Sequence, residues 1–193
     1  MTRILKALPA LGWGLVLIPV AAIAGMAAYL VGSRAGITSA PAVTICLLAA
    51  SEEVSRLGVI FVSRLRGRAN WLIFALPVLA LELTPYVIRS LGASPELVFA
   101  AFSLKLTAAS LHLAASVIYG AAVISRDIRL IALALLGVTA VHCLLNWNGA
   151  ALASLTAVEW LATAAALLTL CATAGWVWKT AEQQPPQTYA SSG

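Results

Sequence analysis

Long apolar stretches dominate the chain, and polar residues gather in short clusters between them. A helix needs ~20 residues to cross the hydrocarbon core of a bilayer, and each stretch is about that long. The expected membrane-spanning segments cover residues of about 8–32, 38–62, 70–91, 97–124, 129–147 and 151–178. The pattern predicts an all-α, polytopic bundle of six transmembrane helices. It forms a single domain over residues 1–180, followed by a disordered polar tail over 181–193.

Composition agrees with a protein whose main partner is the lipid bilayer. Hydrophobic residues make up 62% of the chain and charged residues 10%, and the mean hydropathy is +0.97. In such a chain the net charge of +5 does not indicate a nucleic-acid partner, because Lys and Arg report orientation. With the N-terminus in the cytoplasm, the inner side holds Arg3, Lys6, Arg64, Arg66, Arg68, Arg126, Arg129 and Lys179. The outer side holds Arg34 and Arg89, so the bias predicts that both termini lie inside.

Titratable residues interrupt the apolar stretches at a regular interval. Glu52 and Glu53, Glu82, His112 and His142 recur about every thirty residues. This interval equals one ~20-residue span plus a turn, so the chain returns to the same depth on successive helices. With a rise of ~1.5 Å per residue, all four levels lie roughly 15–20 Å from the cytoplasmic boundary. Ionisable residues at one depth inside a membrane indicate a functional site.

Arg56 on the second span follows Glu52 by four residues and Glu53 by three. At about 100° per residue, its side chain is expected between the two carboxylates. An arginine there can hold one carboxylate ionised and orient it. Two carboxyl groups in unequal environments are an arrangement used for general acid–base catalysis. A buried ion pair that only locks this helix to its neighbours explains the same residues.

Two further candidates lie on the fourth and fifth spans. His112 shares a stripe with Ser116 and Tyr119, which also fits an ordinary hydrogen bond between helices. His142 and Asn146 are four residues apart on one helix face. Together they could stabilise an oxyanion, or the histidine could ligate a metal. Asn146 could instead simply terminate its helix.

Glu82 on the third span lies between Pro77 and Pro85. Two prolines eight residues apart are expected to kink or open this helix. Freed carbonyl groups inside a membrane need protein or water as partners, so some water is expected near Glu82. The chain contains no HExxH or GxSxG motif, and no aspartate pair in a GxGD context. Zincin-type, serine and aspartyl mechanisms therefore lack their residues.

The order of these residues resembles the superfamily of glutamic-type intramembrane proteases. This superfamily includes the CAAX prenyl endopeptidases with their bacterial relatives (CPBP) and the PrsW proteases, and the chain is more similar to PrsW. PrsW proteins carry Glu-Glu-x-x-Lys, a Glu on the next helix, a His followed by small residues ending in Gly, and His-x-x-x-Asn. The matching positions here are Glu52, Glu53 and Arg56, then Glu82, then His112 through Gly120, then His142 and Asn146. Arg56 replaces the Lys of that pattern, and prolines replace its Gly- and Phe-rich setting of the third-helix Glu.

The resemblance implies an intramembrane endopeptidase that uses one activated water. Its substrate would be a membrane-embedded or membrane-anchored protein. Glu52 would be the general base and His112 would share the water. His142 and Asn146 would stabilise the oxyanion of the tetrahedral intermediate.

The resemblance also bears on supporting groups, cofactor and location. Glu53 and Arg56 would fix charge and orientation, while Glu82 receives no clear role. Either no cofactor is required, or a divalent metal such as zinc is bound by Glu52 and the two histidines. The expected location is a prokaryotic plasma membrane, with the chain as an integral protein.

Two other functions fit the same residues. A non-catalytic scaffold could keep the fold and bind partner helices, because the abundant small residues suit close helix packing. A proton- or ion-coupled transporter could use the membrane Glu and His residues as a relay. The sequence shows no internal repeat with paired broken helices, which many transporters have.

Overall fold

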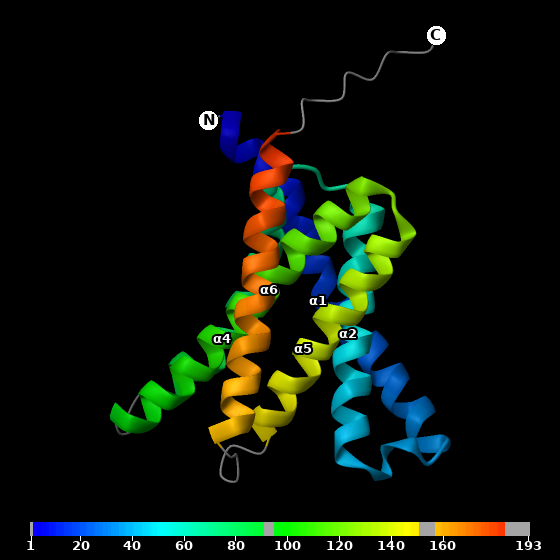
Figure 1. Cartoon of the computed structure of the whole chain (residues 1–193), viewed down its shortest axis with the longest axis vertical. Helices are drawn as coiled ribbons and strands as arrows, with labels where there is room; N and C mark the ends of the chain where they lie inside the picture. The colour runs from blue at the N-terminus through cyan, green and yellow to red at the C-terminus, as the bar shows by residue number, and fades with distance from the viewer. Residues whose placement is uncertain (1, 91–94, 151–156, 184–193) are drawn as a thin grey trace.

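The computed structural model of the chain describes residues 2–90, 95–150 and 157–183, and there it is entirely helical (Figure 1). The helices are α1 (Thr2–Arg34), α2 (Pro41–Ser63), α3 (Arg68–Ser90), α4 (Pro95–Ser125), α5 (Ile128–Ala150) and α6 (Ala157–Gln183), with a short 3-10 helix at Ile37–Ser39. The predicted all-helical fold is confirmed for this part of the chain. The side chain of Glu82 and most of the predicted polar tail lie outside the described residues.

The helices end where the sequence places its polar clusters. Gly36, with φ of 70°, separates α1 from the start of α2. Between α2 and α3, Arg64 and Gly67 have φ of 50° and 86°, and Arg126 between α4 and α5 has φ of 57°. These left-handed residues stop one helix and redirect the chain. α1 begins earlier than the predicted span, and α6 continues into the segment that was expected to be a tail.

In the part of the chain that the structure describes, three helices are long and apolar enough to cross a membrane. They span Leu8–Arg34, Thr107–Ser125 and Ile128–Trp147. α2 has the same length as α5, 23 residues, but carries Glu52, Glu53 and Arg56 in its middle. The chain therefore has the character of a membrane protein, and the charges of α2 need an explanation from its neighbours.

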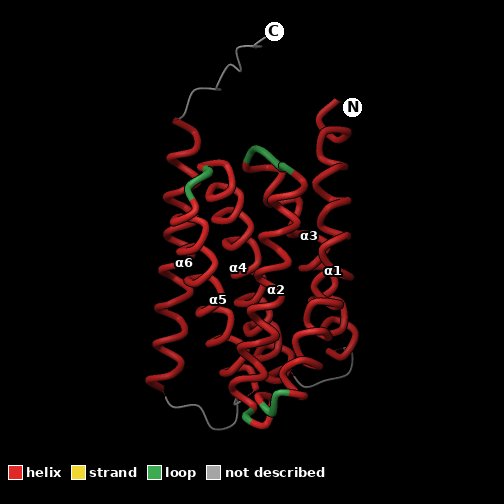
Figure 2. The backbone as a smooth tube through the Cα atoms, turned by 90° about the vertical axis from the view of Figure 1, so that its right-hand side faces the viewer, coloured by secondary structure: helices red, strands yellow, loops and turns green. Residues whose placement is uncertain are grey.

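α4 lies at the centre of the bundle. It packs against α2, α3, α5 and α6, while α1 packs against α2 and α3 on one side. The apolar segment of α4 is 61% buried inside the protein, against 11% for that of α1 and 22% for that of α5. The start of α1 and the end of α6 lie at the same end of the bundle (Figures 1 and 2). α4 is therefore the helix that other helices cover, and it supplies the largest share of the buried side chains among the described residues.

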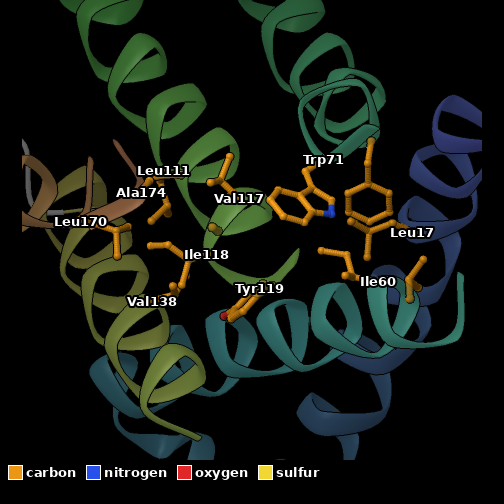
Figure 3. Packing of buried hydrophobic residues seen from close by; sticks show 14 of the residues in the cluster. Leu17, Ile60, Trp71, Leu111, Val117, Ile118, Tyr119, Val138, Leu170 and Ala174 are labelled. Atoms are coloured by element: carbon orange, nitrogen blue, oxygen red, sulfur yellow. The ribbon is translucent and has the colours of Figure 1, made fainter. Parts of the chain in front are cut away.

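The apolar core depends on a close approach of α3 and α4. The Trp71 indole is buried beside Val117 (Figure 3), and its Nε1 donates to the Leu65 carbonyl at 3.1 Å. A Cβ on Gly120 would lie 2.3 Å from the Trp71 ring. Only glycine fits there, because real Cβ contacts are never so short. Gly120, which the resemblance marked as the end of a small-residue stretch, thus has a packing role.

α1 and α3 meet equally closely at Pro77. A Cβ on Gly14 would lie 2.3 Å from the Phe74 carbonyl oxygen and 2.9 Å from the Pro77 ring. The sequence predicted that Pro77 and Pro85 would kink or open this helix. The backbone of α3 is nevertheless helical without interruption from Arg68 to Ser90. Contact with α1 covers the surface where the proline removes a backbone donor.

Candidate functional site

Arg56 is the centre of a buried polar cluster. Its Nη1 donates to Glu53 Oε1 at 2.9 Å and to Oε2 at 3.1 Å. Its Nη2 donates to Glu52 Oε1 at 2.7 Å and also contacts His112 Nδ1. The side chain is 1% exposed. One guanidinium thus joins two carboxylates of α2 to a histidine of α4.

Helical spacing explains why one arginine reaches both carboxylates. Glu52 precedes Arg56 by four residues and Glu53 by three, and these are the two spacings that bring side chains together on a helix. The planar fork of arginine suits two-oxygen contact with a carboxylate such as Glu53. The predicted position of Arg56 between the two glutamates therefore matches the geometry.

Glu53 ties α2 to α5. Its side chain is 0% exposed, and its Oε1 lies 2.7 Å from His142 Nδ1. Arg56 and His142 together bond both carboxylate oxygens. A carboxylate removed from water is tolerated only when it is paired and hydrogen-bonded in this way. Both oxygens of Glu53 are therefore hydrogen-bonded within the bundle.

Both histidines contact the cluster through Nδ1, one as an acceptor and the other as a donor. A carboxylate only accepts hydrogen bonds, so His142 carries its proton on Nδ1 beside Glu53. Arginine only donates, so His112 Nδ1 accepts from Arg56 and the ring proton lies on Nε2. In their neutral forms, His142 thus has a lone pair at Nε2, whereas His112 carries an N–H at Nε2. The rings stand edge to face, with centroids 5.7 Å apart.

Glu52 is the exposed member of the cluster. Its side chain is 28% exposed, and its Oε2 lies 3.8 Å from His142 Nε2. Among the described residues, Glu52 Oε2 makes no hydrogen bond. Two acceptors at this separation do not bond each other directly. A small donor with two hydrogens, such as water, can join them.

A divalent metal ion does not fit this set of donors. One ligand atom from each of Glu52, Glu53 and His112 lies within 4.8 Å of the others, close enough for a single ion. The Arg56 guanidinium, however, contacts Glu52 Oε1, both Glu53 oxygens and His112 Nδ1. An ion there would meet a fixed positive charge at short range. The arginine thus occupies the place of a metal among Glu52, Glu53 and His112. In the predicted set of Glu52 with the two histidines, Arg56 contacts Glu52 Oε1 and His112 Nδ1, whereas Glu52 Oε2 and His142 Nε2 face each other at 3.8 Å.

The predicted site residues divide into three groups. The structure brings together Glu52, Glu53, Arg56, His112 and His142. Asn146 is exposed, and its side chain makes no hydrogen bond in the part of the chain that is described. Glu82 cannot be placed, because its side chain lies outside the described residues.

Sequence reasoning missed two features near the cluster. The Tyr119 hydroxyl is fully buried and has no hydrogen-bond partner among the described residues. Its place on the stripe of His112 was visible, but its lack of a partner was not. A cavity of about 330 Å³ between α1 and α2 is lined by Ala21, Ala22, Gly25, Met26, Leu48, Ser51 and Glu52. The spacing of Ala21 and Gly25, two small residues four apart, could have marked that surface.

Comparisons with models of protein families, with curated proteins and with solved structures find no match to this chain. The fold and the cluster define a class all the same: a helical protein with membrane-type apolar helices and a buried Glu–Arg–His network. Function must be inferred from the geometry of that network.

Proposed function

We propose that the protein is an intramembrane endopeptidase that hydrolyses a peptide bond of a membrane-associated protein with a water activated by Glu52 and His142. The observation that carries this proposal is the pair of facing acceptors, Glu52 Oε2 and His142 Nε2, 3.8 Å apart. A water between them can donate one hydrogen to each, which leaves its oxygen lone pairs for attack. A carboxylate and an imidazole are the side chains most used for general base catalysis.

The contacts favour other roles for the two histidines than those that the resemblance implies. His112 was expected to share the water, but its Nδ1 contacts Arg56. His142 Nε2 faces Glu52 instead. His112 holds Arg56 in place through its Nδ1 contact. With His142 at the water, Asn146, one turn from His142 on α5, remains as the oxyanion donor that the resemblance implies.

The reaction follows from these assignments. The water oxygen bonds to the carbonyl carbon of the substrate, and Glu52 takes a proton from the water. The negative charge forms on the former carbonyl oxygen, where the side-chain amide of Asn146 stabilises it. The carbon–nitrogen bond then breaks, and Glu52 returns the proton to the leaving amine. Glu53 and Arg56 do not exchange protons; they hold Glu52 and both histidines in place.

The proposal includes a membrane setting for the cluster. Six helices would cross the bilayer of a prokaryotic plasma membrane, with both termini in the cytoplasm. Support comes from the three apolar segments of membrane-spanning length. The start of α1 and the end of α6 also share one end of the bundle (Figure 1). In low dielectric the charge pairs around Arg56 act strongly, and competing water is scarce.

Purified protein in lipid nanodiscs, incubated with a panel of fluorogenic membrane-spanning peptides, tests the proposal. We expect cleavage of at least one peptide, and a loss of about 10²–10⁴-fold in rate for Glu52→Gln and for His142→Ala. Val54→Ala is the matched control, because Val54 follows Glu53 on α2 and is 55% exposed. Full activity of Glu52→Gln would refute the assignment. Absence of cleavage by the wild type, with large stability losses in the variants, would favour a scaffold.

A further inference from the structure

Two cysteines meet where α2 packs against α5 (Figure 1). The Cys143 thiol of α5 donates to the Cys46 carbonyl of α2, with 3.8 Å between sulfur and oxygen. The two side chains also interact with each other directly. Cys46 is exposed and Cys143 is partly exposed, so the pair can be reached from outside the bundle. The third cysteine, Cys171 on α6, packs against the apolar core instead.

The pair lies beside the contact that already links the same two helices in the candidate site. Cys143 directly follows His142, whose Nδ1 lies 2.7 Å from Glu53 Oε1. Cys46 precedes Glu53 by about two turns of α2. The charged contact thus holds α2 against α5 close to the thiols. Because the fold keeps the two sulfur atoms together, a reaction between them needs no large movement of the chain.

A covalent bond between these thiols is compatible with the packing of the helices. A disulfide has an S–S distance of ~2.05 Å and joins residues whose Cβ atoms can approach each other. The Cys143 sulfur already contacts the backbone of Cys46. Rotation of the two side chains and a small approach of the helices would therefore bring the sulfur atoms together. Only the weak S–H bond to the Cys46 carbonyl would be lost.

We propose that Cys46 and Cys143 form a reversible disulfide that joins α2 to α5, with a lipid-soluble quinone as the oxidant. Both S–H bonds break and one S–S bond forms. The two electrons and two protons pass to the quinone, which becomes the quinol. A dithiol reverses the reaction by exchange and is itself oxidised. This modification is independent of peptide cleavage and goes beyond the proposed function.

The apolar setting selects the class of oxidant. Cys143 lies in the membrane-type segment Ile128–Trp147, and Cys46 is flanked by Ile45 and Leu47. With a rise of ~1.5 Å per residue, both lie roughly 8–11 Å inside the nearer ends of their helices. A charged oxidant such as glutathione disulfide enters hydrocarbon poorly. A quinone dissolves there, accepts two electrons and can reach the exposed Cys46 from the lipid.

Counting free thiols tests the proposal. The full-length protein in nanodiscs is treated with tetramethyl-1,4-benzoquinone, whose substituted ring disfavours addition of a thiol. Copper phenanthroline serves as a second oxidant that enters lipid, and glutathione disulfide as the charged one. Free thiols are then labelled in detergent and counted by mass spectrometry, and a gel without reductant shows any dimer. The variants are Cys46→Ala and Cys143→Ala, with Cys171→Ala as the matched control.

The wild type should lose two of its three free thiols to the quinone and regain them with dithiothreitol. Cys171→Ala should lose both of its thiols, whereas Cys46→Ala and Cys143→Ala should keep theirs. Glutathione disulfide should act at least about tenfold more slowly. Three remaining thiols after both lipid-soluble oxidants would overturn the pair, and so would a dimer linked through Cys46. Cross-linking by copper phenanthroline but not by the quinone would overturn the oxidant alone.

Thermal unfolding tests whether the disulfide joins the helices of the folded bundle. The two cysteines are 97 residues apart, and closing a long loop stabilises the folded state most. Oxidation should raise the unfolding midpoint of the wild type by at least about 5 °C. It should do the same for Glu53→Gln, because the disulfide joins the helices that this substitution loosens. Cys46→Ala should not respond. A midpoint that stays constant on formation of the disulfide would contradict a link within the native fold.

Discussion

Two buried regions of the bundle, one between α2, α4 and α5 and one between α3 and α4, are held together by different means. Around Arg56, charged hydrogen bonds join α2 to α4 and α5. Around Trp71 and Gly120, shape alone joins α3 to α4, and a single methyl group would not fit. The polar region depends on each partner being present, whereas the apolar region depends on volume. The contrast teaches that the charges of Glu53 and Arg56 connect α2 to its neighbours inside the bundle. Glu52 is the one partly exposed charge among the three.

Removing Arg56 should have the largest effect on stability. Arg56→Leu leaves Glu53 buried without its main partner and places two carboxylates side by side. Loss of one partner from a buried ion pair costs about 3–5 kcal/mol. Unfolding in detergent by a denaturant titration measures the change, with Val54→Ala as control. A change below about 0.5 kcal/mol would mean that water reaches the carboxylates and that the cluster is not closed.

Overfilling the apolar region should cost less. Gly120→Ala places a methyl group against the Trp71 ring, and such overpacking costs about 1–3 kcal/mol. Gly137→Ala is the control, because a side chain there meets no other atom within 4 Å. That control should be neutral or stabilising by up to about 1 kcal/mol, since alanine favours the helix. Equal stabilities of the two variants would contradict the close approach of α3 and α4.

Tyr119 belongs to the apolar core, but its buried hydroxyl is polar. Removing this hydroxyl tests whether it takes part in the polar cluster around Arg56. Tyr119→Phe removes a buried hydroxyl that has no partner among the described residues. The same thermal or denaturant experiment should show an increase in stability of about 1 kcal/mol, because an unsatisfied buried polar group is unfavourable. A decrease would show instead that the hydroxyl belongs to the polar network, through a water or a carboxylate.

Asn146 should matter least for folding. Its side chain is exposed and makes no hydrogen bond to a described residue, so Asn146→Ala should change stability by less than about 0.5 kcal/mol. If Asn146 donates to the oxyanion, the cleavage rate should still fall, by about 10²–10³-fold. An unchanged rate would contradict a role of Asn146 at the oxyanion.

Part of this arrangement could be predicted from the sequence. The interval between Glu52, His112 and His142 gives their common depth, because span length is fixed by the bilayer. The position of Arg56 follows from helix geometry within one element. Span length and side-chain spacing on one helix can both be used without knowing how the helices pack.

The remaining features depend on how each helix is rotated against its neighbours. Sequence spacing does not show that Asn146 is exposed while His142, on the same face of α5, is buried, or that Arg56 reaches a histidine on α4. The same holds for the hollow beside Gly25, which exists because α1 lies against α2 there. Depth is encoded locally, whereas rotation and contact are set by the packing of all helices.

The most direct test of the division between structural and reactive carboxylates compares Glu52→Gln with Glu53→Gln. Both changes remove one charge from adjacent residues, and unfolding and peptide cleavage are measured for each in the same membrane mimic. Glu53→Gln should lose about 3–5 kcal/mol of stability, because Arg56 and His142 lose a buried ionic partner. Glu52→Gln should stay within about 1 kcal/mol of the wild type and lose cleavage. Equal destabilisation of the two variants, or cleavage that survives Glu52→Gln, would contradict that division.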